Sequence, residues 1–238
     1  MPSSSTRRRR SCDNSPPSPS PPGNNCIARD YSALPREALL VLFSKIPHAD
    51  ILRGAGLVCT SWRKVAIAEP ALWQHIDLAT SDDKVDGDDV VPEAMVRAAV
   101  DYSAGQCESF RGPAAADLLV YLAERSPSLM SIHVTSWFHI REEALIEGVI
   151  KKLPVLERLV VSSGYFDASA DVMRAFLSHC PRLELLDVGG CYKSTMLGYR
   201  VRERCKRAIK VLRLPKNDPH DCRCCIDYSQ RYADEHDE

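Results

Sequence analysis

The residues best suited to chemistry in this sequence are cysteines and a histidine near its C-terminal end. The acidic tail at 218–238, together with two upstream positions, supplies soft metal ligands: His220, Cys222, Cys224, Cys225, Cys191 and Cys205. Four such ligands can hold zinc tetrahedrally. The C-x-C-C run lacks the paired C-x-x-C spacing typical of zinc sites, so we predict no metal site and no cofactor. The alternative to a zinc site is a disordered or capping tail whose thiols are idle.

The remaining catalytic candidates are scattered along the chain. A nucleophilic cysteine or serine needs a base and an orienting group in one pocket, and no local pattern brings these together. His75, His133 and His179 are expected to serve structure or to face solvent. The sequence also lacks both G-x-x-x-x-G-K-[ST] and G-x-G-x-x-G, the patterns that bind phosphates. We therefore predict that the chain is not an enzyme.

Composition places the chain among ordinary globular proteins. It has 238 residues, 45% hydrophobic and 26% charged, with a net charge of −1. The sequence contains no run of 18 apolar residues, so we predict no membrane span. The N-terminal basic run is not followed by the apolar segment of a secretory signal. We expect an intracellular protein with reduced cysteines. The balanced charge argues against nucleic acid as the main partner.

The first 29 residues form a separate tail. They are rich in proline and serine and contain almost no apolar residues, so we expect residues 1–29 to be disordered. Arg7 to Arg10 form a run of four positive charges. Such a run serves as a nuclear localisation signal or touches nucleic acid non-specifically, and the alternative is an idle solvated tail. We predict a location in nucleus and cytoplasm.

The segment from Tyr31 to Leu78 is predicted to form three short helices. The first spans about Pro35 to Lys45, because proline suits the first turn of a helix and Pro47 then ends it. Asp50 is the expected N-cap of the second helix, which Gly54 and Gly56 must keep short or bent. Three helices of this size cannot enclose all their large apolar side chains. Part of that surface must pack on the rest of this chain or on a separate protein.

The order of motifs in this segment resembles an F-box, which we assign to residues 30–78. The motifs are Leu34-Pro35, Ile46-Pro47, Leu57-Val58-Cys59, Trp62-Arg63, Leu72-Trp73 and Ile76-Asp77-Leu78. The resemblance implies docking to the Skp-family adaptor of an SCF ubiquitin ligase and, through it, to a cullin. It also implies which residues line the contact or hold its helices: Leu34, Pro35, Leu39, Ile46, Ile51, Val58 and Trp62. The two glycines of the second helix depart from the pattern and would weaken docking.

An internal repeat occupies residues 101–217, after an acidic linker and connecting helix at 79–100. Four apolar-x-x-apolar-x-apolar triplets recur at intervals of 27, 27 and 26 residues: Leu129, Ile132, Val134; Leu156, Leu159, Val161; Leu183, Leu186, Val188; Ile209, Leu212, Leu214. This period is typical of leucine-rich repeats. Three residues after each triplet, where Asn or Cys is favoured, stand Trp137, Gly164, Cys191 and Asn217. Cys107 and Phe110 form a degenerate earlier unit that we interpret as an N-terminal cap.

Helical stretches between the triplets complete the units. Apolar residues at helical spacing predict helices over Ala114–Ser126, Arg141–Lys152 and Ser169–Cys180. Pro127, Pro154 and Pro181 stop these helices, each two residues before a triplet begins. We therefore predict an α/β fold, in which a three-helix F-box is followed by a short leucine-rich-repeat solenoid with parallel strands inside and helices outside.

The residues that alternate with the buried positions of each strand are expected to face a partner. They are Ser131, His133, Arg158, Val160, Leu185, Asp187, Val211 and Arg213, continued by Thr135, Ser162, Gly189 and Pro215. An F-box followed by such repeats resembles the plant F-box/LRR proteins, and the run SAGQCESF at 103–110 adds to the likeness. In that family the repeats hold a substrate protein while the F-box ties it to the ligase.

The resemblance and the repeat together favour a substrate receptor of an SCF ubiquitin ligase. Such a receptor binds a target and raises its effective concentration near the conjugating enzyme, without itself breaking bonds. One rival is a leucine-rich-repeat scaffold that assembles no ligase. A second rival gives the main role to the arginine tail and the cysteine tail. The substrate, and any modification or small ligand it requires, are not encoded in a recognisable pattern.

Overall fold

The computed structural model describes residues 31–79, 91–137, 140–162, 164–192 and 197–215. The chain divides into two units, residues 1–31 and residues 32–238, and the sheet with its covering helices belongs to the second unit. Some predictions fall outside the described residues: those on the 1–29 tail with Arg7 to Arg10, on the acidic linker at 80–90, on Asn217 and on the 218–238 tail with His220, Cys222, Cys224 and Cys225.

Short helices fill the segment predicted as an F-box. They are η1 (Tyr31–Ala33), α1 (Arg36–Phe43), α2 (His48–Arg53), η2 (Ala55–Leu57), α3 (Thr60–Ala68) and η3 (Pro70–Trp73). The second helix is short as predicted, because its backbone leaves the helical region at Gly54. The prediction of Asp50 as its N-cap is wrong, since Pro47 precedes the first helical residue and Asp50 lies within the first turn.

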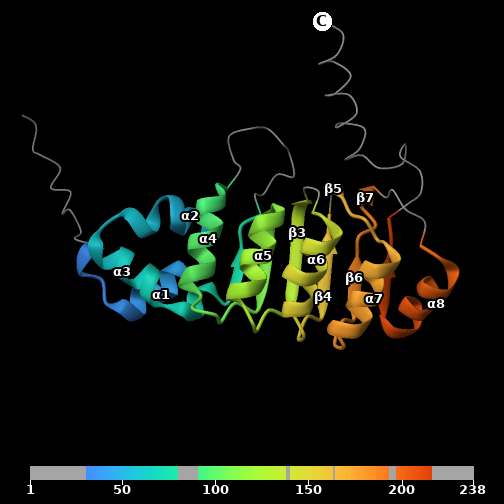
Figure 1. The fold of residues 1–238 in the computed structure, drawn as a ribbon. Helices are drawn as coiled ribbons and strands as arrows, with labels where there is room; N and C mark the ends of the chain where they lie inside the picture. Colours follow the sequence, from blue (N-terminus) through green and yellow to red (C-terminus); the bar gives the residue numbers. More distant parts are fainter. Residues whose placement is uncertain (1–30, 80–90, 138–139, 163, 193–196, 216–238) are drawn as a thin grey trace, which may run out of the picture. The chain divides into compact units, whose positions relative to one another are not determined.

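Parallel strands and helices alternate through the rest of the chain (Figure 1). In chain order they are β1 (His75–Asp77), α4 (Glu93–Tyr102), β2 (Ser109–Ala114), α5 (Ala116–Arg125), β3 (Ser131–Trp137), α6 (Glu142–Gly148), η4 (Ile150–Lys152), β4 (Arg158–Val161), β5 (Gly164–Tyr165), α7 (Ala170–His179), β6 (Leu185–Asp187), β7 (Cys191–Tyr192), α8 (Tyr199–Ala208) and β8 (Val211–Arg213). The strands pair in the order β1-β2-β3-β4-β6-β8, and β5 pairs with β3 and β7. The helices α4 to α7 lie side by side over one face of this sheet.

The register aligns the repeat units as the triplets predict. Ile132 pairs with Leu159, Leu159 with Leu186 and Leu186 with Leu212. The triplet residues of the first three units are at most 5% exposed, while Leu212 and Leu214 at the last unit are half-buried. The predicted α/β fold, with short helices followed by a parallel leucine-rich-repeat solenoid, is therefore confirmed.

The sheet begins earlier than the triplets indicate. Ile76 of β1 pairs with Phe110 of β2, and Phe110 pairs with Ile132. The strand β1 lies inside the segment assigned to the F-box, so the helices of that segment run directly into the sheet. Cys107 and Phe110, predicted as a cap, are buried and occupy the positions of a full repeat unit.

The helices of the repeats differ from the prediction in two places. The helix expected over Arg141–Lys152 is divided into α6 and η4, because the backbone changes direction at Val149. A close packing contact lies beside this break: a Cβ on Gly148 would come within 2.7 Å of a methyl of Val120 on α5. The helix α8 was not predicted, since its sequence is dominated by arginine and lysine rather than by an apolar stripe. Within the described residues, no helix has the length and hydrophobicity needed to cross a membrane.

Candidate functional site

The residues predicted to contact an adaptor fall into two groups by exposure. Leu39, Ile51 and Trp62 are buried, at 0%, 1% and 9% exposed, so they hold the helices together and cannot touch a partner directly. Leu34 and Ile46 are half-buried, and Pro35 and Val58 are exposed. Any direct contact to an adaptor must therefore come from this second group.

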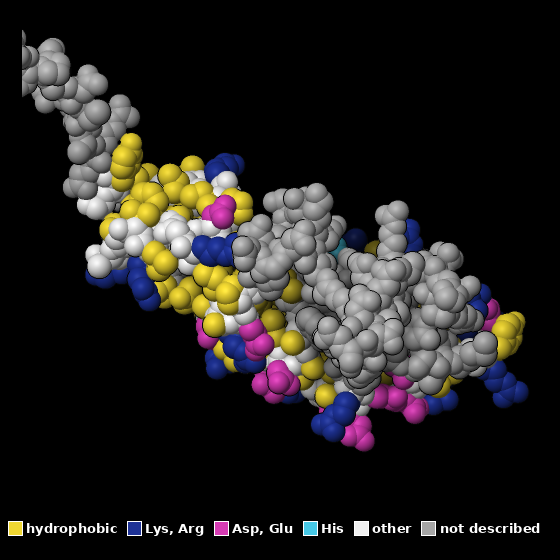
Figure 2. Space-filling view, turned by 90° about the horizontal axis from the view of Figure 1, so that it is seen from above, with side chains coloured by type: hydrophobic (Ala, Val, Ile, Leu, Met, Phe, Trp, Pro, Cys, Tyr) yellow, Lys and Arg dark blue, Asp and Glu magenta, His cyan; other side chains and the backbone are white. Residues whose placement is uncertain are grey.

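Four exposed large apolar residues of the same segment were missed by the sequence analysis: Tyr31, Val41, Leu57 and Ile67. Val41 on α1 is 64% exposed and Leu57 in η2 is 59% exposed, next to Val58 at 61%. Figure 2 shows hydrophobic side chains gathered over the F-box helices, whereas charged side chains of both signs lie along the edge of the repeats. Such an uncovered group of large apolar side chains is typical of a docking surface. We call Leu34, Pro35, Val41, Ile46, Leu57 and Val58 the F-box surface.

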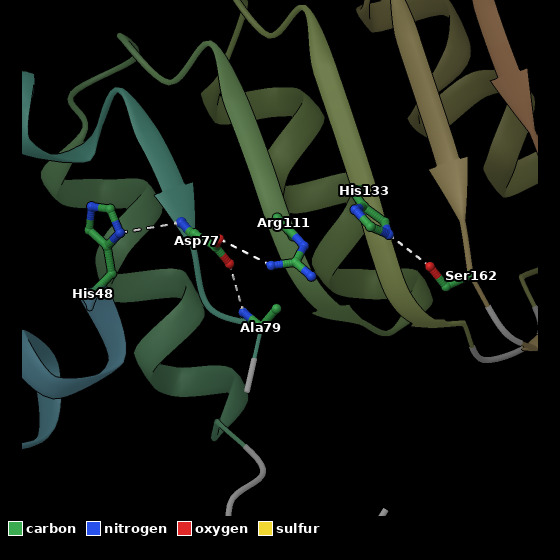
Figure 3. A network of polar contacts seen from close by, with 6 residues as sticks. All are labelled: His48, Asp77, Ala79, Arg111, His133 and Ser162. Atoms are coloured by element: carbon green, nitrogen blue, oxygen red, sulfur yellow. Dashed lines mark hydrogen bonds and ion pairs between the residues drawn. The ribbon is translucent and has the colours of Figure 1, made fainter. Parts of the chain in front are cut away.

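A buried aromatic contact positions the F-box helices against the first strand. Trp73 is fully buried, and its indole N–H donates to the carbonyl oxygen of Ala66 at 2.7 Å. Its ring centroid lies 5.2 Å from that of His48 on α2 and 5.5 Å from that of Tyr102 on α4. The imidazole of His48 also lies 3.0 Å from the carbonyl oxygen of Leu72 and accepts the backbone N–H of Asp77 at 3.3 Å (Figure 3).

The predicted substrate residues form two rows across the face of the sheet opposite to the helices, which we call the open face. The first row contains His75, Ser109, Ser131, Arg158, Leu185 and Val211. The second row contains Asp77, Arg111, His133, Val160, Asp187 and Arg213. Four of these twelve, on β1 and β2, were not predicted. The expectation that Pro215 faces a partner is wrong, because it is buried after the end of β8.

The charged side chains of the second row are paired with each other. Arg111 donates to the carboxylate of Asp77 at 3.2 Å, and Asp77 also accepts the backbone N–H of Ala79 (Figure 3). At the other end of the row, Arg213 donates to Asp187 at 3.0 Å. Between these pairs, the ring of His133 lies 2.7 Å from the hydroxyl of Ser162. The second row is therefore nearly neutral, and its polar groups are occupied by neighbours.

Among the described residues, the first row has a side-chain hydrogen bond only at one end. The ring of His75 lies 3.1 Å from the hydroxyl of Ser109. Arg158 is exposed, and its side chain has no hydrogen bond or ion pair to any residue of the described part of the chain. The next two residues of the row are apolar: Leu185 is half-buried and Val211 is 41% exposed. This part of the row is available to a partner.

An open hollow of about 560 Å³ lies beyond the second row. It is lined in part by Val160, Ser162, Asp187, Gly190 and Arg213. A hollow of this size lies within the range of about 300–1,000 Å³ that is usual for ligand pockets. A group that enters it meets the Asp187–Arg213 pair rather than a free charge.

A concentration of positive charge on α8 was also missed. Arg200, Arg202, Arg204, Lys206 and Arg207 are exposed on this helix. Its one acidic residue, Glu203, accepts from Lys206 at 2.9 Å. The helix therefore attracts anionic molecules by charge alone, without sequence selectivity.

The described cysteines lie mostly in the core. Burial raises the pKa of the Cys107 thiol to about 11 and that of the Cys180 thiol to about 12. Cys180 donates to the carbonyl oxygen of Leu153, and Cys191, at the repeat position where Asn or Cys is favoured, donates to that of Val161. Among residues 31–215, as far as they are described, no group of three or more His, Cys, Asp or Glu could hold a metal ion.

We expect Cys107 and Cys180 to resist alkylation by iodoacetamide at pH 8 in the folded chain, because the thiolate is the reactive form. The half-buried Cys59 should react before these two, and urea should remove the difference, as peptide mass spectrometry can measure. Equal labelling of Cys59, Cys107 and Cys180 in the folded chain would contradict this assignment.

The raised pKa values of Cys107 and Cys180 also predict a loss of stability from about pH 9 toward pH 11. In this range the unfolded chain releases these thiol protons before the folded chain does, which favours the unfolded state.

Comparison with known proteins agrees with this architecture. The F-box-like family model matches residues 31–79. The chain is 28% identical to F-box protein SKIP19 of Arabidopsis thaliana, over 81% of this chain and 79% of that protein. It is 26% identical to putative F-box/LRR-repeat protein 23 (81% of this chain, 55% of that protein) and 28% identical to putative F-box/LRR-repeat protein 22 (68% and 52%), both from the same plant. The chain thus spans about half the length of these last two relatives.

These findings show what the chain is similar to. It contains an F-box-like domain followed by leucine-rich repeats, and it is similar to F-box and F-box/LRR-repeat proteins of Arabidopsis thaliana. F-box proteins in general are non-catalytic adaptor subunits that bind Skp-family proteins and recognise substrates in SCF complexes.

Proposed function

We propose that this chain is the substrate-recognition subunit of an SCF-type ubiquitin ligase. The observation that carries the proposal is the F-box-like match over residues 31–79, together with exposed apolar side chains that no other described part of the chain covers. The F-box surface would bind the Skp-family adaptor and, through it, the cullin. The open face of the repeats would bind the target protein.

The mechanism is one of proximity. The chain would hold a substrate lysine near the charged conjugating enzyme, so that transfer becomes effectively intramolecular. The continuous sheet supports this role, because β1 directly follows the F-box helices and leads into the repeats. A receptor whose two binding surfaces belong to one packed unit can hold its substrate at a fixed distance from the ligase. We also propose that it works in nucleus and cytoplasm.

Capture of a purified Skp-family adaptor by the full chain tests the proposal. We expect Val58→Asp to lower capture by at least about tenfold, because it places a charge in the apolar contact. Val58 is 61% exposed, so the variant should keep the circular dichroism spectrum and melting temperature of the original chain.

Tyr199→Asp is the matched control, since Tyr199 is 77% exposed but lies on α8 at the far end of the repeats. It should capture the adaptor as well as the original chain does. If the original chain captures no adaptor, the ligase proposal fails and the leucine-rich-repeat scaffold becomes the better description. If both variants capture it equally, the F-box surface has been placed wrongly.

A further inference from the structure

The first row of the open face has the features of a site for one chemical class of partner. Resting on the proposed function, we infer that it recognises an extended peptide segment with an anionic side chain close to one or two large aliphatic side chains. The anionic group would bind Arg158, and the aliphatic groups would cover Leu185 and Val211.

The charge argument depends on what the other ionic groups of the open face already do. Asp77 with Arg111, and Asp187 with Arg213, form pairs between neighbouring strands at 3.2 and 3.0 Å. An anion that approaches such a pair meets little net positive charge, since the neighbouring carboxylate already offsets the arginine. Arg158 keeps all five of its N–H donors available within the described structure, and this planar fork matches a carboxylate or a phosphate in two-point contact.

The spacing argument follows from the register of the sheet. In the register of the sheet, Arg158 on β4 lies beside Leu185 on β6, and Leu185 lies beside Val211 on β8. The three residues therefore stand in line across these strands. Neighbouring strands lie about 4.8 Å apart, which puts Val211 roughly 10 Å from Arg158. An extended peptide advances about 3.3 Å per residue, so its aliphatic residues should follow or precede the anionic one within three positions.

The contacts of the second row explain why we place the peptide on the first row. The second row presents groups that are already bonded to each other, such as His133 with Ser162 at 2.7 Å. A partner lying there would have to break these contacts before making its own. Leu185 and Val211, by contrast, still have apolar surface that a partner can remove from water.

An array of ten-residue peptides tests the inference with the purified full chain. The peptides should place Glu, phosphoserine, Gln or Lys at one position and Leu or Ser at each of the next three. We expect binding to require Glu or phosphoserine together with Leu, and the ratio between these two anionic forms tells carboxylate from phosphate recognition.

Four variants make the outcome specific. Arg158→Gln should weaken binding of the selected peptides by about tenfold, and Arg158→Glu should shift the preference to the peptides that contain Lys. Leu185→Ser should remove the preference for Leu while keeping the preference for the anionic residue. Arg202→Gln on α8 removes the same charge from an exposed arginine off the open face, and it should change nothing.

Adaptor capture measured on the same samples separates this inference from the function on which it rests. Capture of the adaptor without any peptide preference overturns the inference and leaves the proposed function standing. Peptide preferences that persist unchanged in Arg158→Glu overturn it as well. Loss of the preferences in Arg202→Gln would show attraction by total charge and would equally overturn it.

Discussion

Replacing Trp73 by alanine is expected to lower the free energy of unfolding by about 3–5 kcal/mol, the range for a large aromatic residue removed from a packed core. Trp73 is fully buried between the F-box helices and the connecting helix α4. The substitution removes the contacts with His48 and Tyr102 and also the hydrogen bond to Ala66. Urea unfolding of the full chain, followed by circular dichroism, measures the change.

Two further variants separate the causes of this loss. Trp73→Phe keeps an aromatic ring but lacks the indole N–H, so it should cost about 1–2 kcal/mol, as for a lost buried hydrogen bond with some lost packing. Tyr199→Ala removes an aromatic residue that is 77% exposed. Its free energy of unfolding should lie within about 0.5 kcal/mol of that of the original chain. If Trp73→Ala is no worse than Tyr199→Ala, Trp73 does not join the F-box to the repeats as the structure describes.

The repeat units were predictable because their signal is local and recurs. Pro154 and Pro181 stop helices, and the buried triplets that follow them hold the same place in every unit. Ser169 was predicted to begin a helix, and its hydroxyl accepts the N–H of Val172 at the start of α7. Each of these signals depends only on residues within one unit, so one sequence is enough to find them.

The first two strands were harder to place because the period fails there. Ile76 and Phe110 are 34 residues apart, and Phe110 and Ile132 are 22 apart, whereas the later units keep to 26 or 27. The three residues of β1 carry too little pattern to identify a strand. Their place in the sheet depends on pairing with β2, a contact between distant parts of the chain.

The ion pairs of the open face could not be derived from the sequence for the same reason. Arg213 and Asp187 were both predicted to face a partner, but their pairing depends on the register between β6 and β8. The exposure of Val41 and Leu57 likewise depends on which faces of the short helices pack inward. Residue type identifies candidates, and only the packing decides which of them remain available.

Gly190 marks a second place where a small substitution should have a large effect. A Cβ built on Gly190 would lie 2.1 Å from the backbone oxygen of Ser162 and 3.1 Å from its carbonyl carbon. Both neighbours are backbone atoms at the end of β4, so no side chain can rotate away to make room. We expect Gly190→Ala to lower the free energy of unfolding by about 3 kcal/mol, the upper end of the usual cost of overpacking.

Gly189→Ala is the matched control, because it adds the same methyl group one residue earlier. The Cβ there would lie 3.4 Å from Arg213 and from the carboxylate of Asp187, which is ordinary contact, so the change should stay within about 0.5 kcal/mol. The hydroxyl of Ser162 also contacts the ring of His133, so Gly190→Ala should disturb the open face. Adaptor capture should stay intact at temperatures below the lowered melting temperature of this variant. Equal unfolding energies for the two variants would mean that the chain at Gly190 does not lie against β4 as described.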